Sequence, residues 1–166
     1  MLLITEPDPD DAGEIFFVQR QTWHESYTHE ISHEEIEHRF ADAPERIEAM
    51  KERIAEENPE EKFFVAREPD TAKIVGFISM TKQPENEIRS LYVLDRYKSR
   101  GIGSQLIKEG FRWFGNEEIV VHVSTEPENK PVLRFYRKKG FRPIRSLPSE
   151  ECAPFEMMEM RRKPQK

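Results

Sequence analysis

The sequence feature that most constrains the fold is a glycine-containing segment, RGIG at residues 100–103, between a strand-like and a helix-like stretch. Residues 87–94 before it are rich in β-branched and other apolar side chains, and residues 103–114 after it are amphipathic. The first N–H groups of a helix lack intrahelical acceptors, and the helix dipole is positive at that end. Glycine permits close approach of a ligand, and Lys98 and Arg100 add positive charge. The segment therefore predicts an anion-binding site.

Two nucleotide-binding motifs compete for the same glycines, and neither fits. A P-loop requires G-x-x-x-x-G-K-[ST], but Gly101 and Gly103 have the wrong spacing and no Lys-Ser or Lys-Thr pair follows them. A dinucleotide fingerprint requires G-x-G-x-x-G, but the third glycine position is Leu106. A glycine turn that only begins a helix remains open as the simplest interpretation of an isolated G-x-G.

Hydrophobic periodicity divides the chain into a helical N-terminal third and a strand-rich remainder. Helices are predicted at residues 11–27, from the cap at Ser32 to Phe40, and at 45–57, 103–114 and 129–138. Strands are predicted at residues 2–4, 62–67, 73–80, 87–94, 118–123, 141–147 and 155–161. This order indicates an α/β or α+β sheet with helices on both faces.

Composition indicates a soluble globular protein. Of the 166 residues, 36% are hydrophobic, and no apolar run approaches the roughly 20 residues that a membrane-spanning helix needs. The net charge of −6 argues against a nucleic-acid partner, and the single cysteine, Cys152, cannot form an internal disulfide. We therefore expect one domain over residues 1–166 and a cytoplasmic location without membrane or nucleic-acid partners, and we allow for a homodimer.

Charge is distributed unevenly along the chain. Residues 1–61 contain 18 acidic and 5 basic side chains, a net charge of −13, whereas residues 62–166 have a net charge of +7. The two parts could serve different ligands, although Glu-rich solvated helices would produce the same asymmetry.

A second motif lies downstream of the glycine segment, where residues 129–141 read NKPVLRFYRKKGF. This run resembles N-x-x-A-x-x-F-Y-x-x-x-G-F, a signature of the GNAT superfamily, the GCN5-related N-acetyltransferases. Residues 88–93, the loop 98–103 and the apolar helix positions that follow resemble motif A of the same family. Residues 62–161 are therefore similar to a GNAT domain, which implies the GNAT fold: a mixed, mostly antiparallel sheet of about seven strands with helices on both faces.

Two positions depart from the family pattern. Lys98 stands three residues before the first loop glycine, where family members usually have Gln or Arg, so the charge is kept but the fork geometry of a guanidinium is lost. Val132 replaces the frequent Ala of the second signature. This second change should affect packing more than chemistry.

The resemblance implies acetyl-coenzyme A as co-substrate and no metal. The pyrophosphate would lie over the backbone amides of residues 100–104, which agrees with the anion site predicted from the glycines. In the family, the strand before this loop opens at a bulge and frees backbone groups for the pantetheine arm, and one N–H there could polarise the thioester carbonyl. The residues that the resemblance assigns to coenzyme binding are Leu91, Tyr92, Val93, Lys98, Arg100, Gly101, Ile102, Gly103, Ser104, Asn129 and Tyr136.

The resemblance assigns the two catalytic roles to Tyr136 and Glu87. A phenol near the coenzyme sulfur can protonate the departing thiolate as a general acid, although a tyrosine beside Phe135 is by itself more typical of a core. Glu87 is the family-like candidate for the base that deprotonates the amine, directly or through water. Asn129 is also a good N-cap residue for the helix of the second signature, and Cys152, outside both motifs, receives no role.

In this superfamily the acceptor usually enters beside the N-terminal helices and the loop between the last two strands. Here that side contains Trp23, Glu25 and Tyr27, together with residues 148–151. The run TWHESY, residues 22–27, is similar to the first-helix pattern of polyamine-acetylating members, and the acidic N-terminal third would attract a cation. We interpret the protein as an N-acetyltransferase for a small cationic amine such as a polyamine. The alternatives are acetylation of a peptide N-terminus or ribosomal protein, and a coenzyme A sensor without catalysis.

Four histidines in the N-terminal third raise the question of a metal site. They are His24, His29, His33 and His38. Their spacings fit no closed zinc site, and no cysteine accompanies them. We therefore expect solvated helix histidines and no metal.

Overall fold

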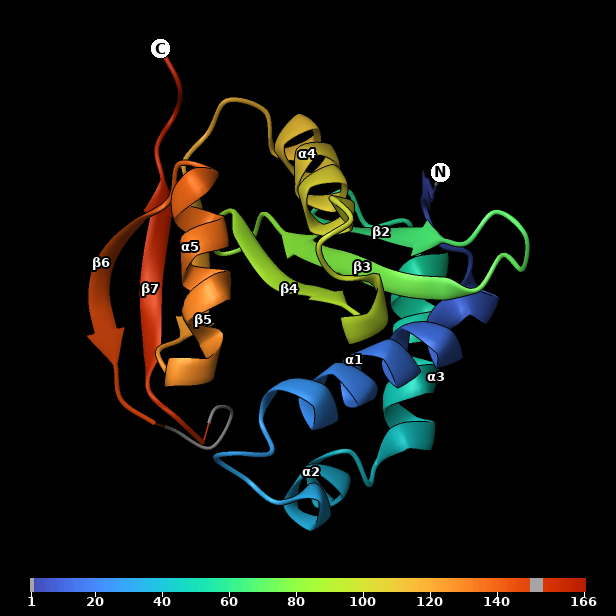
Figure 1. Ribbon diagram of the computed structural model, residues 1–166. Helices are drawn as coiled ribbons and strands as arrows, with labels where there is room; N and C mark the ends of the chain where they lie inside the picture. The colour runs from blue at the N-terminus through green and yellow to red at the C-terminus, as the bar shows by residue number, and fades with distance from the viewer. Residues whose placement is uncertain (1, 150–153) are drawn as a thin grey trace.

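The computed structural model describes residues 2–149 and 154–166 and contains one seven-stranded sheet flanked by helices (Figure 1). The strands are β1 (Leu3–Thr5), β2 (Glu61–Arg67), β3 (Ile74–Thr81), β4 (Glu87–Val93), β5 (Ile119–Ser124), β6 (Arg142–Leu147) and β7 (Met157–Arg162). The α-helices are α1 (Ala12–Ser26), α2 (His33–Arg39), α3 (Ala43–Ala55), α4 (Ile102–Phe114) and α5 (Lys130–Lys138). Three single-turn 3-10 helices, η1 (Pro9–Asp11), η2 (Asp95–Tyr97) and η3 (Pro127–Asn129), precede α1, α4 and α5.

The strand order is β1-β2-β3-β4-β5-β7-β6. Neighbouring strands are antiparallel except β4 and β5, which are parallel. A parallel pair needs a crossover connection, and α4 supplies it between β4 and β5. The seven-stranded, mostly antiparallel sheet expected from the family resemblance is confirmed.

The parallel strands β4 and β5 separate soon after they meet. Their described pairing consists of Glu87 with Val120 and Ile88 with Val121, at the amino end of each strand. The register between β3 and β4 shifts next to these pairs. Ser79 of β3 pairs with Ser90 and Met80 pairs with Ile88, which leaves Arg89 as an extra residue in β4. A bulge of this kind bends the strand, and the described pairing of β4 with β5 does not extend beyond Ile88. The bulge expected from the resemblance is thus present, and the sheet opens into two arms.

Helices cover both faces of the first arm, with α4 on one side and α1 and α3 on the other (Figure 1). On the α4 face, Gly110 of α4 packs directly against Ile78 and Met80 of β3. On the opposite face, the ring of Phe77 lies 5.8 Å from that of Tyr92. Side chains of adjacent residues in a strand point to opposite faces, and every residue of β3 is buried, so β3 is covered on both sides.

A second, smaller apolar cluster joins the N-terminal helices to each other. Phe16 of α1, Ile36 of α2 and Phe40 are buried together. The rings of Phe16 and Phe40 meet edge-to-face with 5.6 Å between their centroids. As the sequence predicted, Ser32 caps α2, and its hydroxyl accepts the N–H of Glu35. The cluster therefore attaches α2 to α1 at one end of the sheet.

Element boundaries differ from the predicted ones by one or two residues. Helix α3 begins at Ala43 and not at residue 45, because Pro44 fits in the first turn of a helix and does not end it. Strand β7 begins at Met157 and not at residue 155. Among the described residues, none of the helices is both long and apolar enough to cross a membrane. Glu150, Glu151 and Cys152, named from the sequence, lie outside the described residues.

Candidate active site

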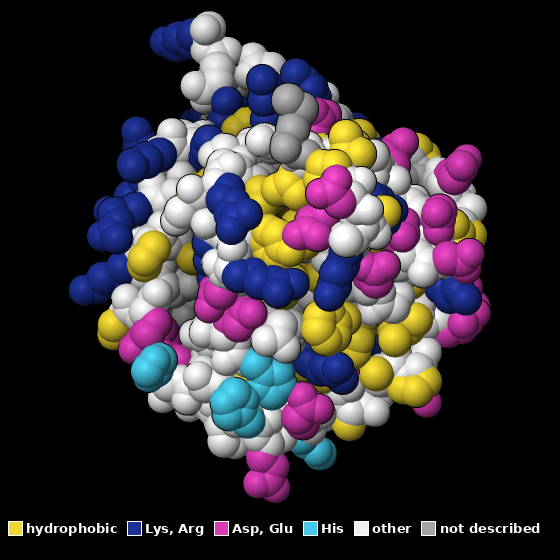
Figure 2. All heavy atoms as spheres, turned by 45° about the vertical axis from the view of Figure 1, so that its right-hand side comes forward, with side chains coloured by type: hydrophobic (Ala, Val, Ile, Leu, Met, Phe, Trp, Pro, Cys, Tyr) yellow, Lys and Arg dark blue, Asp and Glu magenta, His cyan; other side chains and the backbone are white. Residues whose placement is uncertain are grey.

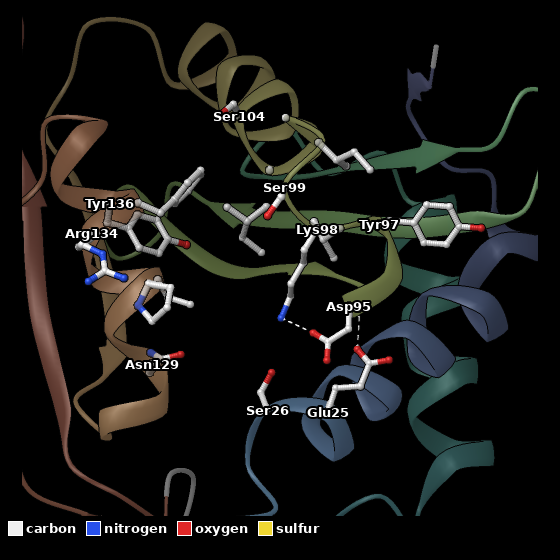
Figure 3. A pocket seen from close by; sticks show the side chains of 18 of the residues that line it. Glu25, Ser26, Asp95, Tyr97, Lys98, Ser99, Ser104, Asn129, Arg134 and Tyr136 are labelled. Atoms are coloured by element: carbon white, nitrogen blue, oxygen red, sulfur yellow. Dashed lines mark hydrogen bonds and ion pairs between the residues drawn. The ribbon is translucent and has the colours of Figure 1, made fainter.

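A cavity of about 800 Å³ lies where the two arms of the sheet separate. Its walls come from the β4 arm, the loop before α4, the first turn of α4, and the η3–α5 segment (Figure 3). The cavity brings together nine of the residues predicted to bind the coenzyme: Leu91, Val93, Lys98, Gly101, Ile102, Gly103, Ser104, Asn129 and Tyr136.

The N-terminus of α4 forms one wall of the cavity. Gly101 precedes the helix with φ +79°, a left-handed conformation that favours glycine, and no side chain caps the helix. A Cβ atom on Gly101 would have no neighbour within 4 Å, so open space lies beside the helix terminus. The N–H groups of the first turn are therefore free of a side-chain cap, and the anion expected there from the sequence stays a prediction.

The two cations of the loop are arranged differently from each other. Lys98 lines the cavity, and its Nζ lies 2.6 Å from Oδ1 of Asp95 (Figure 3). The Arg100 guanidinium lies over the ring of Tyr97, 5.3 Å from its centroid, and Arg100 is not among the residues that line the cavity. Lys98 is therefore the loop cation placed to meet a ligand there.

Three basic residues that the sequence analysis did not single out also line the cavity: Arg134, Lys138 and Lys139. They lie on α5 or directly after it. Arg134 and Lys138 are four residues apart, so they share one face of the helix. This i, i+4 spacing within the second signature is the signal that could have identified them.

Tyr136 is buried in the wall that α5 contributes. Its side chain lies edge-to-face against Phe135 and Phe141, at centroid distances of 5.3 and 5.4 Å. Burial, and then the nearby Tyr92 phenol, raise the pKa of the Tyr136 hydroxyl well above its ordinary value. The phenol is therefore protonated at neutral pH, as a general acid must be. Tyr136 thus belongs to the core and to the cavity at once.

Asn129 does not cap α5 in the way its position suggested. It occupies the N-cap position, but its Nδ2 donates to the carbonyl of Ser124, 2.8 Å away, and it makes no capping hydrogen bond. The cause is the preceding 3-10 turn, which gives Asn129 φ −93° and ψ 3°, whereas a capping residue usually has extended backbone. Its buried side chain instead connects the start of α5 to the end of β5. The prediction that the Asn129 side chain caps α5 was therefore wrong.

Tyr92 lies on the other face of the β4 arm from Leu91 and Val93, which line the cavity. Its hydroxyl accepts a hydrogen bond from the indole Nε1 of Trp23, 3.2 Å away. Any contact between Tyr92 and a ligand in the cavity would therefore come from its backbone, which the bulge leaves unpaired with β5.

The three predicted acceptor residues lie in two places. Trp23 and Tyr27 form an aromatic cluster with Phe155, in which the Tyr27 ring lies 4.9 Å from Trp23 and 4.7 Å from Phe155. Burial raises the pKa of the Tyr27 hydroxyl. Glu25 lies on the cavity side, and its Oε2 accepts the N–H of Asp95 (Figure 3). The aromatic pair and the carboxylate therefore face different parts of the site.

Glu87, the predicted base, does not line the cavity and faces His122 of β5. Its Oε1 lies 3.4 Å from Nδ1 of His122. The Nε2 atom of the same imidazole lies 3.7 Å from Oε1 of Glu159 in β7. The sequence signal for His122, which the predictions above do not use, is its place in the otherwise apolar run IVVHV at residues 119–123.

Acidic side chains gather at the edge of the cavity near the N-terminal helices. The carboxylates of Glu30, Glu126 and Glu128 lie within 4.8 Å of one another, and Glu128 also lines the cavity. Partial burial, and then the Glu128 carboxyl, raise the pKa of Glu30. On the face that Figure 2 shows, Lys and Arg side chains gather along the left edge and many Asp and Glu side chains along the right edge.

Two of the four N-terminal histidines, His24 and His33, pair with each other. The rings of His24 and His33 stack, with their Nδ1 atoms 2.6 Å apart, and Nε2 of His24 lies 2.6 Å from Oε1 of Glu37. Among the described residues, the three glutamates at the cavity edge are the group whose ligand atoms are close enough together to share a metal ion, and no histidine belongs to it. The absence of a metal remains a prediction.

A mixed sheet that opens beside an uncapped, glycine-containing helix terminus defines the N-acetyltransferase class of folds. The model of the Acetyltransferase (GNAT) family matches residues 20–141, and the chain belongs to this family. The resemblance found from the two sequence motifs is thereby confirmed, and the protein is an acetyl-coenzyme A-dependent N-acetyltransferase by class.

Solved structures agree with this fold. The PaiA N-acetyltransferase from Thermoplasma acidophilum in complex with coenzyme A is 21% identical with a TM-score of 0.77, covering 98% of this chain and 99% of that one. A spermidine N-acetyltransferase SpeG chimera from Vibrio cholerae and hSSAT is 16% identical with a TM-score of 0.69, covering 98% and 95%. Arabidopsis thaliana NAA60 with a bisubstrate analogue is 17% identical with a TM-score of 0.64, covering 97% of each chain. No curated protein sequence matches this chain.

Proposed function

We propose that the protein transfers the acetyl group of acetyl-coenzyme A by direct attack of a small cationic amine, such as a polyamine. The main support is that the buried, protonated phenol of Tyr136 and the uncapped N-terminus of α4 line one cavity. An anion site and a general acid are the two groups that the reaction needs on the coenzyme side.

The coenzyme would be held mainly by backbone. The pyrophosphate would accept hydrogen bonds from the N–H groups of residues 102–104, with Lys98 beside it. The pantetheine arm would lie along the part of β4 that is not paired with β5, near Leu91 and Val93. The basic side chains of Arg134, Lys138 and Lys139 would bind the phosphate that coenzyme A carries on its ribose, in addition to the pyrophosphate. The residues present thus fit the co-substrate.

The proton balance assigns separate roles to Glu87 and Tyr136. The acceptor arrives as an ammonium ion, and Glu87 takes one proton, directly or through water, to free the nitrogen lone pair. A C–N bond then forms at the thioester carbonyl carbon and the C–S bond breaks. Tyr136 gives its proton to the thiolate and regains one from the acceptor nitrogen. One proton in total is released with the amide and coenzyme A.

A cationic acceptor is supported by the acidic side chains near the N-terminal helices. The Glu30, Glu126 and Glu128 carboxylates are close enough together to attract a multiply charged amine. The aromatic cluster of Trp23 and Tyr27 offers an apolar wall for the methylene segments between amines. A fold shared with a spermidine N-acetyltransferase is compatible with this acceptor but does not select it.

Thiol release from acetyl-coenzyme A with a panel of amines tests the proposal. We expect turnover with spermidine or spermine that exceeds turnover with N-terminal peptides, and a loss of about 10²-fold or more in kcat for Tyr136→Phe. Calorimetry should show that this variant binds acetyl-coenzyme A as the wild type does. Turnover with peptides alone would favour peptide acetylation, and tight coenzyme binding without turnover of any amine would favour a sensor.

A further inference from the structure

One group of charged side chains outside the coenzyme cavity is connected across β4, β5, β6 and β7. Its centre is the imidazole of His122, between the carboxylates of Glu87 and Glu159. We propose that His122 is the positioning residue for Glu87, and that the pair accepts the proton of the acceptor amine. This inference rests on the proposed function and assigns to His122 a part in the same reaction.

The position of the pair follows from the sheet register. Glu87 pairs with Val120 in the parallel β4–β5 ladder, and His122 follows two residues later on the same face of β5. The next pair, Ile88 with Val121, is the last before the two strands separate. The contact between Glu87 and His122 therefore lies where the opening of the sheet begins. That opening is also where the unpaired backbone of β4 would hold the thioester end of the coenzyme.

Glu159 fixes the other side of the imidazole. Its side chain is only 6% exposed, and its oxygens lie 3.2 Å from Nη2 of Arg145 and 3.3 Å from Nε of Arg161. Although burial acts to raise it, these two guanidinium groups hold the pKa of Glu159 below its ordinary value. Glu159 therefore stays a carboxylate that attracts the Nε2–H group of His122, 3.7 Å away, and so orients the ring.

Glu87 lacks this restraint. Its side chain is 26% exposed and that of His122 is 33% exposed, so both reach solvent. Glu87 pairs with Thr81 and Tyr92 with Phe77, so Glu87 lies on the same face of the sheet as Tyr92, which bonds Trp23 of the aromatic cluster. With Nε2–H directed at Glu159, the Nδ1 lone pair of neutral His122 faces Glu87. A proton that Glu87 takes from the ammonium can then move to Nδ1, which returns Glu87 to the carboxylate form. One N–H bond breaks on the amine, one forms on the imidazole, and nothing is oxidised or reduced.

A base works best when its pKa lies near the working pH. The hydrogen bond with Glu87 raises the pKa of His122, partial burial lowers it, and the charges of Glu87 and Glu159 raise it further, with a net rise. The cations that face this group are Arg145 of β6 and Arg161 of β7, and Arg161 is shared with Glu85 and Glu118. The alternative is that the ion pair only holds β4 against β5, and the tests below separate the two roles.

The first test measures the imidazole without any acceptor. In labelled protein, the NMR pH titration of His122 should give a pKa above that of free histidine, and Glu87→Gln should lower it. Exposed His38 provides the reference signal, and its titration should not change. A His122 titration that is the same in wild type and Glu87→Gln would overturn the proposed pair, whatever amine the enzyme acetylates.

The second test separates proton removal from structure. We expect His122→Gln to lower kcat/KM for spermidine about 10-fold to 100-fold near neutral pH and to shift the alkaline pH profile, with an unchanged KM for acetyl-coenzyme A. Turnover of hydroxylamine, which is already neutral at that pH, should be much less affected, and added imidazole should restore part of the activity of His122→Ala. The matched control is His38→Gln.

The outcomes distinguish this inference from the proposed function. Equal losses with spermidine and hydroxylamine, without imidazole rescue, would show that His122 has a structural role only. If the protein binds acetyl-coenzyme A but acetylates neither probe, the proposed function fails, and the NMR titration still decides whether Glu87 and His122 form a proton-sharing pair.

Discussion

A Cβ atom on Gly103, in the first turn of α4, would lie 3.6 Å from two carbon atoms of the Phe135 ring in α5. Helix α4 follows β4, the first arm of the opened sheet, and α5 follows β5, the second arm. The distance corresponds to ordinary van der Waals contact, so the first turn of α4 and the Phe135 ring of α5 lie side by side and form one continuous wall. The glycine segment and the second signature therefore build the cavity together, although they lie far apart in the sequence.

Replacing Gly101 by Asp should weaken the binding of acetyl-coenzyme A. The change places a carboxylate beside the helix terminus where the pyrophosphate is proposed to lie, and a loss of about 1.4 to 2.8 kcal/mol corresponds to a 10-fold to 100-fold higher Kd. The matched control is Gly101→Asn, because Asn has the same shape and also tolerates the φ of +79° found here. Calorimetry measures both variants. Equal affinities for the two would show that the phosphate lies elsewhere.

Replacing Asn129 by Asp should destabilise the protein by about 1 to 3 kcal/mol, because a buried amide donor becomes a carboxylate that faces the carbonyl of Ser124. The control is Asn116→Asp, in which an exposed amide also donates to a carbonyl, that of Gln165. Urea unfolding should show a much smaller effect for the control. Similar losses in both variants would mean that burial of Asn129 does not matter.

The local part of the active site could be predicted from the sequence. The glycines at 101 and 103 lie at a strand–helix junction, and neighbouring residues in the chain determine that geometry. The register of the sheet could not be predicted in this way, because it pairs residues that lie far apart in the sequence. The pairing of Glu87 with Val120 and the contact of Glu87 with His122 exist only because α4 returns the chain beside β4. Periodicity within one strand contains no information on that pairing.

Asn129 illustrates the same limit at one residue. Its type and place before a helix are typical of an N-cap, and propensity treats the preceding residues as a loop. They form a 3-10 turn, and this turn changes the backbone angles of Asn129 and directs its amide to Ser124. The residue type of Asn129 therefore predicted the start of α5 correctly but predicted the wrong hydrogen bond for its side chain. The carbonyl of Ser124 at the end of β5 is the partner that the folded chain provides.

The stability of the fold should depend on pH through His122. Its pKa is raised in the folded state, first by the hydrogen bond with Glu87. The stabilisation is therefore complete below the ordinary histidine pKa of about 6.5 and is lost as the pH rises through the higher folded pKa. The difference in unfolding free energy between wild type and His122→Gln should narrow over that range. A difference that is constant with pH would contradict an ionic role for the imidazole.

Replacing Gly76 by Ala should destabilise the sheet at the position where β3 supports the opened arm. A Cβ atom there would lie 2.9 Å from the backbone oxygen of Tyr92 and 3.2 Å from Cγ2 of Val93. Backbone in the middle of a sheet cannot move aside easily, so we expect a loss of about 1 to 3 kcal/mol. Gly13→Ala is the control, because its Cβ would have no neighbour within 4 Å in α1, and there the loss of chain entropy in the unfolded state should add about 0.4 to 1 kcal/mol of stability.

The same Gly76 variant also tests whether the β4 arm positions the coenzyme. A shift of β4 that relieves the contact with Tyr92 would also move the next residue, Val93, which lines the cavity. Folded Gly76→Ala should therefore bind acetyl-coenzyme A more weakly than Gly13→Ala, as calorimetry at a temperature where both are folded would measure. Unchanged affinity in a destabilised variant would mean that the strain is absorbed in β3, and that the β4 backbone contributes little to holding the coenzyme.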